Sequence, residues 1–116
     1  MLYYIVDLTR RPDVSHEDFE RRWLDEHLAM VRGLPGVASA AFYPVADPAD
    51  SDGQGPSGIG VLGFRTRADL DRALASPEGS ALRRHTGLFA DSEGARRLIA
   101  REPVGFSRAE DETDES

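Results

Sequence analysis

Four short segments of this chain are rich in apolar residues and are separated by polar turns or by stretches with a different period. Their β-branched and aromatic residues predict β-strands over residues 2–8, 37–45, 59–65 and 96–103. In the first strand, even-numbered residues from Leu2 to Leu8 share one face, and odd-numbered residues from Tyr3 to Asp7 share the other. Both faces of the first and third strands are largely apolar, which indicates that both are buried.

Residues 16–32 follow the period of a helix instead. At about 100° per residue, an arc of roughly 120° contains Phe19, Trp23, His27, Met30, Val31 and Leu34. Ser15 precedes this helix as a favourable N-cap, and Gly33 ends it. Thr66 can cap a further helix that begins near Arg67, and Ser76-Pro77-Glu78 indicates a break followed by a new helical start that reaches about Phe89.

The order of these elements, β-α-β-β-α-β, predicts an α+β fold. It is the order of a ferredoxin-like sandwich, in which a four-stranded antiparallel sheet carries its helices on one face. The other face is then uncovered, and an antiparallel sheet that faces water is expected to be polar on that side. Since it is apolar here, we expect it to pack against a second copy of the chain, as a homodimer.

The length of 116 residues suits one domain, which we place at residues 1–104. Residues 105–116 carry five carboxylates in their last seven positions and predict a disordered acidic tail. The polar segment 47–58 is long for a hairpin connection, and the sequence leaves open whether it covers a site. No apolar run approaches the roughly 18 residues of a membrane span, and no signal peptide is recognisable, so we expect a cytoplasmic protein with no membrane partner.

Composition excludes several kinds of chemistry. The chain has no cysteine, which excludes disulfides and a thiolate nucleophile, and no lysine, which excludes a Schiff base. The formal charge of −7 argues against a nucleic-acid partner, because such partners require a clustered basic surface. No two histidines have the spacing of metal ligands, and no phosphate-binding loop is complete, so we expect neither a metal nor a cofactor.

His27 carries the clearest chemical signal, because it lies inside the apolar stripe of the first helix. Burial beside Trp23 and Met30 would lower the pKa of the imidazole and keep the ring neutral at pH 7. A neutral imidazole can take a proton from an acidic carbon or from a phenol. The alternative is a core histidine bonded to a backbone carbonyl, and the residues alone leave both interpretations open.

A family resemblance adds to this pattern. The motif Phe19-x-x-x-Trp23-x-x-x-His27, followed by Val31-x-x-Leu34-Pro35-Gly36, resembles the EthD-like family of the dimeric α/β-barrel superfamily. The similarity continues through Ser76-Pro77-Glu78-Gly79 and covers residues 2–104. The resemblance implies a ferredoxin-like protomer whose sheet faces that of a second protomer, with a small cavity between sheet and helices. His27 matches the family's helix histidine.

Members of this superfamily include muconolactone-type isomerases, polyketide cyclases and dehydratases, and cofactor-free monooxygenases. The resemblance therefore implies a cofactor-free lyase, cyclase or isomerase that acts on a small aromatic or polyketide-like molecule. A cofactor-free monooxygenase and a non-catalytic small-molecule-binding protein are the alternatives.

In the first case His27 is the general base, and Tyr3 or Asp7 orients the substrate or stabilises an enolate. The candidate substrate-binding residues are Trp23, Tyr43, Phe64 and His85. His85 follows two arginines near a helix end, where a solvated cation would also fit. No role transfers to His85 from the family.

Overall fold

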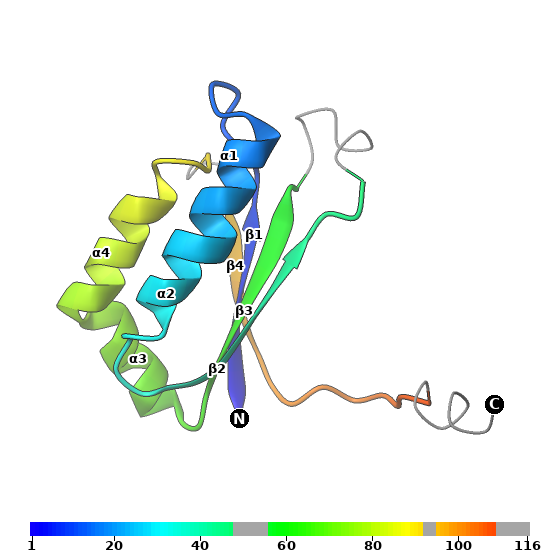
Figure 1. Cartoon of the computed structure of the whole chain (residues 1–116). Helices are drawn as coiled ribbons and strands as arrows, with labels where there is room; N and C mark the ends of the chain where they lie inside the picture. The colour runs from blue at the N-terminus through cyan, green and yellow to red at the C-terminus, as the bar shows by residue number, and fades with distance from the viewer. Residues whose placement is uncertain (48–55, 92–94, 109–116) are drawn as a thin grey trace.

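The computed structural model describes residues 1–47, 56–91 and 95–108 and contains a four-stranded antiparallel sheet. In the sheet order β2-β3-β1-β4, the strands are β2 (Val37–Pro44), β3 (Gly58–Phe64), β1 (Leu2–Leu8) and β4 (Arg96–Ala100). Figure 1 shows the helices as a separate layer on one face of this sheet. The predicted ferredoxin-like sandwich is therefore confirmed.

Three consecutive helical segments join β1 to β2, and two helices join β3 to β4. They are α1 (His16–Glu20), the π-helical segment η1 (Arg21–His27), α2 (Leu28–Val31), α3 (Arg67–Ala75) and α4 (Pro77–Thr86). The N-caps predicted at Ser15 and Thr66 are confirmed, because each hydroxyl accepts from a backbone N–H group at 3.1 Å. The hydroxyl of Ser76 caps α4 in the same way, at 3.0 Å. None of the helices in the described ranges is long and apolar enough to cross a membrane.

The middle of the first helical stretch is π-helical, whereas the sequence predicts one continuous α-helix there. The backbone N–H that follows η1 bonds to the carbonyl of Trp23, five residues back. The buried side chains of this stretch are spaced by four residues, at Phe19, Trp23, His27 and Val31. In an α-helix, side chains four residues apart point in directions that differ by about 40° around the helix axis. The wider turns of a π-helix reduce this difference, so that Trp23 and His27 face the sheet together.

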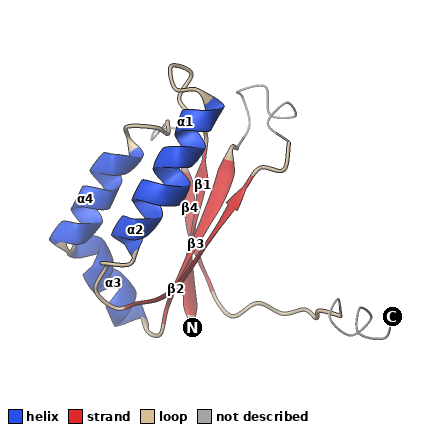
Figure 2. Ribbon diagram, viewed as in Figure 1, coloured by secondary structure: helices blue, strands red, loops and turns tan. Residues whose placement is uncertain are grey.

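Strand register decides which residues of the sheet meet the helices. Tyr4 pairs with Leu62 on the face toward the helices, which we call the inner face. Tyr3 and Asp7 alternate with these residues and lie on the opposite, outer face. Figure 2 shows no helix over the outer face. The two faces of β1 are divided as the alternation of its residues predicts.

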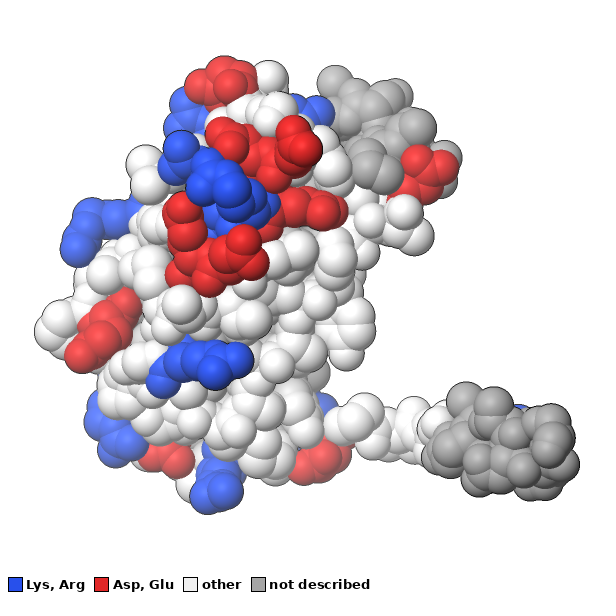
Figure 3. All heavy atoms as spheres, viewed as in Figure 1, with Lys and Arg blue, Asp and Glu red and all other residues white. Residues whose placement is uncertain are grey.

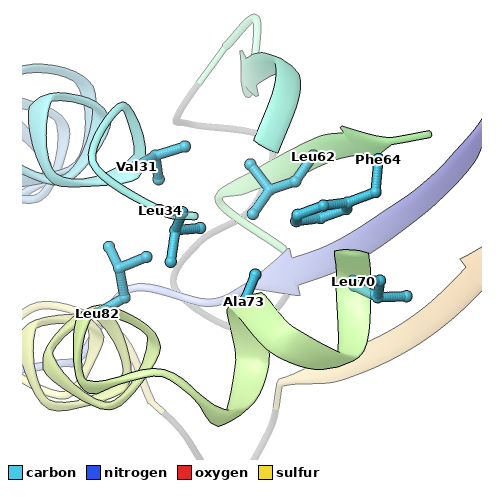
Figure 4. Close-up of a cluster of buried hydrophobic side chains, with 7 residues drawn as sticks. All are labelled: Val31, Leu34, Leu62, Phe64, Leu70, Ala73 and Leu82. Atoms are coloured by element: carbon cyan, nitrogen blue, oxygen red, sulfur yellow. The ribbon is translucent and has the colours of Figure 1, made fainter. Parts of the chain in front are cut away.

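Two clusters of buried apolar side chains hold the helices to the inner face. The first, drawn in Figure 4, consists of Val31, Leu34, Leu62, Phe64, Leu70, Ala73 and Leu82. The second consists of Leu8, Phe19, Trp23, Phe89 and Ala90. Phe42 of β2 packs against both clusters, so that they form one continuous layer between helices and sheet.

The chain beyond β4 leaves the sheet. Residues 101–108 are exposed and run outward without strand pairing, as Figure 1 shows, so β4 ends three residues before its predicted end at residue 103. Most of the predicted acidic tail and most of the predicted 47–58 loop lie outside the described residues.

Gly79, in the first turn of α4, lies against the end of α3. A Cβ atom at this position would lie 2.3 Å from the carbonyl oxygen of Ala73, which belongs to the backbone and cannot swing aside. We expect Gly79→Ala to lower the free energy of unfolding by about 1–3 kcal/mol, as overpacking usually does, in urea titrations. Gly105→Ala is the matched control, because a Cβ there has no neighbour within 4 Å. Equal effects of the two substitutions would contradict this packing.

Candidate active site

A cavity of about 80 Å³ lies between the helical layer and the inner face of the sheet. Apolar side chains from β1, β2, β3 and the helices form most of its wall. The polar side chains in the wall belong to Tyr4, His27, Arg83, Thr86 and Arg97. Such a mostly apolar hollow with a few convergent polar groups is the usual form of a small-molecule site.

His27, the last residue of η1, is only 9% exposed and lines this cavity. Aromatic rings surround it: the centroid of Phe89 lies 5.5 Å away in an edge-on arrangement, and that of Phe42 lies 6.2 Å away. Trp23, one turn earlier, stacks on Phe42 at 4.9 Å. The apolar surroundings expected for His27 are thus present.

A chain of hydrogen-bonded side chains leads from His27 to the surface. Nδ1 of His27 lies 3.0 Å from Nδ1 of His85 on α4, and the two rings stack with centroids 5.2 Å apart. Nε2 of His85 lies 3.1 Å from a carboxylate oxygen of Glu26, whose other oxygen accepts from Arg21 at 2.9 Å. Figure 3 shows acidic and basic side chains gathered over α1 and η1, and η1 is the element that carries Arg21 and Glu26.

Burial and hydrogen bonding set the charges of this chain. Burial, and secondarily the charge of His85, lowers the pKa of His27 from 6.5 to about 4. The hydrogen bond from His85 is the main cause that lowers the pKa of the Glu26 carboxyl, and the charge of Arg21 adds to it. At pH 7, therefore, His27 is neutral and Glu26 is negative.

The hydrogen-bond partners also assign the ring protons. His85 donates its Nε2–H to Glu26, because a carboxylate can only accept. While His85 is neutral its Nδ1 is an acceptor, so His27 donates its Nδ1–H to it. Nε2 of His27 is then unprotonated, and no side chain in the described part of the molecule bonds to it. The arrangement leaves a neutral base at the cavity wall.

The structure brings together only some of the residues selected from the sequence. Trp23 and His27 line the cavity, and His85, with a side chain only 13% exposed, bonds to His27 rather than standing in solvent. Phe64 is buried in the first core cluster and is not part of the cavity wall.

The other three candidates lie on the outer face, away from His27. Tyr3 lies over Gly63, where an added Cβ would be 3.3 Å from its ring. The carboxylate of Asp7 bonds to Arg96 at 3.2 Å. Tyr43 is exposed. None of the three is part of the cavity wall.

One contact and three residues of the site were not predicted from the sequence. The contact between His27 and His85 joins residues 58 apart, and no local pattern indicates it. Glu26 resembles any surface carboxylate of a helix. Tyr4 could have been preferred over Tyr3, because Tyr4 shares the face of β1 that carries the buried Leu8. Arg97 alternates with Leu98 on a short edge strand, where the order of polar and apolar residues does not indicate which face is inward. Among the described residues, no group of three or more histidine or acidic side chains could hold a metal ion.

A model of the EthD domain matches residues 11–93, more than half of the chain. The chain belongs to the EthD family. No curated protein matches it. Among solved structures, this EthD domain is similar to an EthD family protein from Bacillus halodurans, with 18% identity, a TM-score of 0.69, and coverage of 89% of this chain and 100% of that one.

Two further structures have the same fold as this EthD domain. SnoaB, described as a cofactor-independent oxygenase from Streptomyces nogalater, has 12% identity, a TM-score of 0.67, and coverage of 90% of this chain and 94% of its own. A protein of unknown function from Bacteroides fragilis, described as dimeric with a ferredoxin-like fold, has 12% identity, a TM-score of 0.67, and coverage of 87% and 95%. At these identities the likeness shows the fold alone.

Proposed function

We propose that this EthD domain is a cofactor-independent lyase, cyclase or isomerase that moves a proton on a small ring-bearing molecule. The observation that carries the proposal is the neutral, buried His27, whose Nδ1 is engaged by His85 and whose Nε2 is left for a ligand. A general base of this kind takes a proton from an acidic carbon and returns it to another position of the same molecule.

The cavity restricts the class of substrate. Its volume of about 80 Å³ is below the roughly 300–1,000 Å³ of drug-sized sites, so it can hold little more than part of one small molecule. Arg97 is exposed and also lines the cavity, which puts a cation at the mouth. A small aromatic or enolisable ring that carries a carboxylate fits both features, with its ring inside and its charge at Arg97.

Phenylpyruvate is a suitable first probe, because it combines a ring, a carboxylate and an acidic C–H bond. We expect the protein to accelerate exchange of its C3 protons for deuterium in D₂O, followed by ¹H NMR, over buffer alone. A panel of other ring-bearing 2-oxo acids and unsaturated lactones extends the test. Saturable binding of panel members without any exchange would identify a binding protein instead.

A cofactor-independent oxygenase is the second candidate. The shared fold of SnoaB and the position of His27 support it, because a neutral imidazole can also deprotonate a phenol whose anion reacts with oxygen. Oxygen uptake with phenolic probes in a sealed electrode chamber separates the two candidates. Uptake that depends on both protein and phenol would favour the oxygenase, and its absence alongside deuterium exchange would favour the isomerase-type reaction.

We infer that the protein forms a homodimer through the outer face of its sheet. What supports this is the exposure of Tyr43, Ile59 and Leu98 on that face, together with Val104 and Phe106 on the segment beyond β4. Several exposed apolar side chains on one face usually mark an interface. The dimeric protein of similar fold is consistent with the inference.

Leu98→Asp tests the dimer. Leu98 lies beside Ile5 on the outer face, so a carboxylate there would be buried without a partner at the interface. We expect the wild-type protein to be a dimer at micromolar concentration by size exclusion with light scattering, and the variant to be a monomer. Leu88→Asp is the control, because Leu88 is similarly exposed, at 52% against 56%, but follows α4. A monomeric wild-type protein would contradict the inference.

A further inference from the structure

We propose that the base at this site is the pair His27 and His85, with His85 receiving the proton and Glu26 stabilising it there. The inference rests on the proposed function and deepens it, because it assigns two more residues to the proton transfer. It stands on the continuous hydrogen bonds from the cavity wall to the surface, through Nδ1 of both rings and Nε2 of His85.

His27 is poorly placed to act alone, because its surroundings disfavour the protonated ring. The pKa of about 4 means that burial, together with the charge of His85, disfavours the protonated ring by roughly 300-fold relative to an exposed imidazole. Arg83 and Arg97 line the same cavity, so a positive charge on His27 would add to theirs. A base that must hold the proton in these surroundings would be slow.

The hydrogen bonds offer a route that keeps His27 neutral. Nε2 of His27 forms an N–H bond to the proton that leaves the substrate carbon, and the electron pair of the broken C–H bond stays on the substrate as an enolate. The Nδ1–H bond of His27 breaks, and that proton forms an N–H bond at Nδ1 of His85, 3.0 Å away. His27 has then changed tautomer without gaining charge. The reverse steps return a proton to the substrate.

The positive charge comes to rest where the surroundings favour it. On His85 it is held against the carboxylate of Glu26 through Nε2–H, at 3.1 Å. The side chain of Glu26 is 45% exposed, so solvent supports this ion pair, whereas His27 is buried. Arg21 bonds to the same carboxylate and Arg22 lies nearby, and both hold Glu26 in its charged form.

Two-bond ¹H–¹⁵N NMR of the imidazole rings tests the pair without any substrate. At pH 7.5 we expect His27 as the Nδ1–H tautomer and His85 as the Nε2–H tautomer. When acid adds one proton to the pair, we expect it on His85, and His27 must switch to the Nε2–H tautomer in the same step. The proposal would be overturned if His27 is the Nε2–H tautomer at pH 7.5. It would also be overturned if the tautomer of His27 does not change when His85 is protonated.

His85→Asn separates proton transfer from mere orientation of His27. Its side-chain oxygen can still accept from Nδ1–H of His27, but it cannot take up a proton. We expect kcat for deuterium exchange to fall by up to roughly 300-fold, with KM unchanged and the tautomer switch abolished. Glu26→Gln should also lower kcat for deuterium exchange, because the carboxylate that stabilises the proton on His85 is lost.

A second histidine–glutamate pair provides the matched control. Nε2 of His16 lies 3.0 Å from Glu20 on α1, and neither residue lines the cavity. His16→Asn and Glu20→Gln should leave both kcat and the tautomer switch unchanged. Full exchange activity in His85→Asn would overturn the proposal and leave His27 as the sole base. If the tautomer switch is observed but the protein exchanges deuterium into none of the probes, the pair is supported and the proposed function is contradicted.

Discussion

Replacing His27 by asparagine is expected to lower kcat for proton exchange by about 10²–10⁴-fold, the usual contribution of a general base. The asparagine keeps a polar group near the position of Nδ1 and can still bond to His85, but it offers no basic nitrogen at the position of Nε2. Because the aromatic neighbours Phe42 and Phe89 remain, we expect the melting temperature to change by only a few degrees. Deuterium exchange on phenylpyruvate and thermal unfolding followed by circular dichroism provide the two measurements.

His16→Asn is the control for this substitution, since His16 is also paired with a glutamate but lies on α1, outside the cavity wall. It should retain full activity. If His27→Asn keeps wild-type turnover, the base is another residue. If it unfolds the protein, His27 is a structural core histidine, as the alternative interpretation of the sequence holds.

The stability of the protein is expected to fall as the pH falls from 6.5 to 4, because His27 resists protonation in the folded state. Its pKa is lowered from 6.5 to about 4 by burial. Between these values the unfolded chain binds more protons than the folded one, so stability increases with pH across this window. The loss should amount to about 2 kcal/mol at pH 5 and about 3 kcal/mol at pH 4, relative to pH 7.5. Urea unfolding at a series of pH values measures it.

His27→Asn again isolates the effect, because it removes the titrating group. Between pH 7.5 and pH 5, the unfolding free energy of the wild type should fall by about 2 kcal/mol more than that of the variant. Exposed carboxylates with lowered pKa values, such as Asp13 and Asp18, lose their own contributions at lower pH, below the window of His27. Parallel pH profiles for the two proteins would show that His27 does not carry the effect.

Local features of the chain were predictable because neighbouring residues encode them. The N-caps Ser15 and Thr66 need only a hydroxyl followed by backbone N–H groups within one turn. Strands and their two faces follow from alternation with a period of two. The order of elements then permits few topologies, and the ferredoxin-like sheet is among the simplest.

Which residues belong to the site depends on contacts that the chain forms only when it is folded. Tyr3 and Tyr4 are adjacent and equally suited to a strand, and only the placement of the helices puts Tyr4 at the cavity and Tyr3 on the outer face. The π-helical segment is an intermediate case. Its signal is the spacing of four residues between Phe19, Trp23 and His27, but packing against the sheet is what favours the wider turn.

The sequence by itself determined the fold, the family, and His27 as the buried histidine of an apolar helix face. Only the tertiary structure decided that His27 bonds to His85 and that His85 bonds to Glu26, and that Tyr3 and Asp7 lie on the opposite side of the sheet. The physical reason is that periodicity and capping act within one element. The contact of η1 with α4 instead depends on how two helices pack on a common sheet, and no residue near His27 in the chain specifies that.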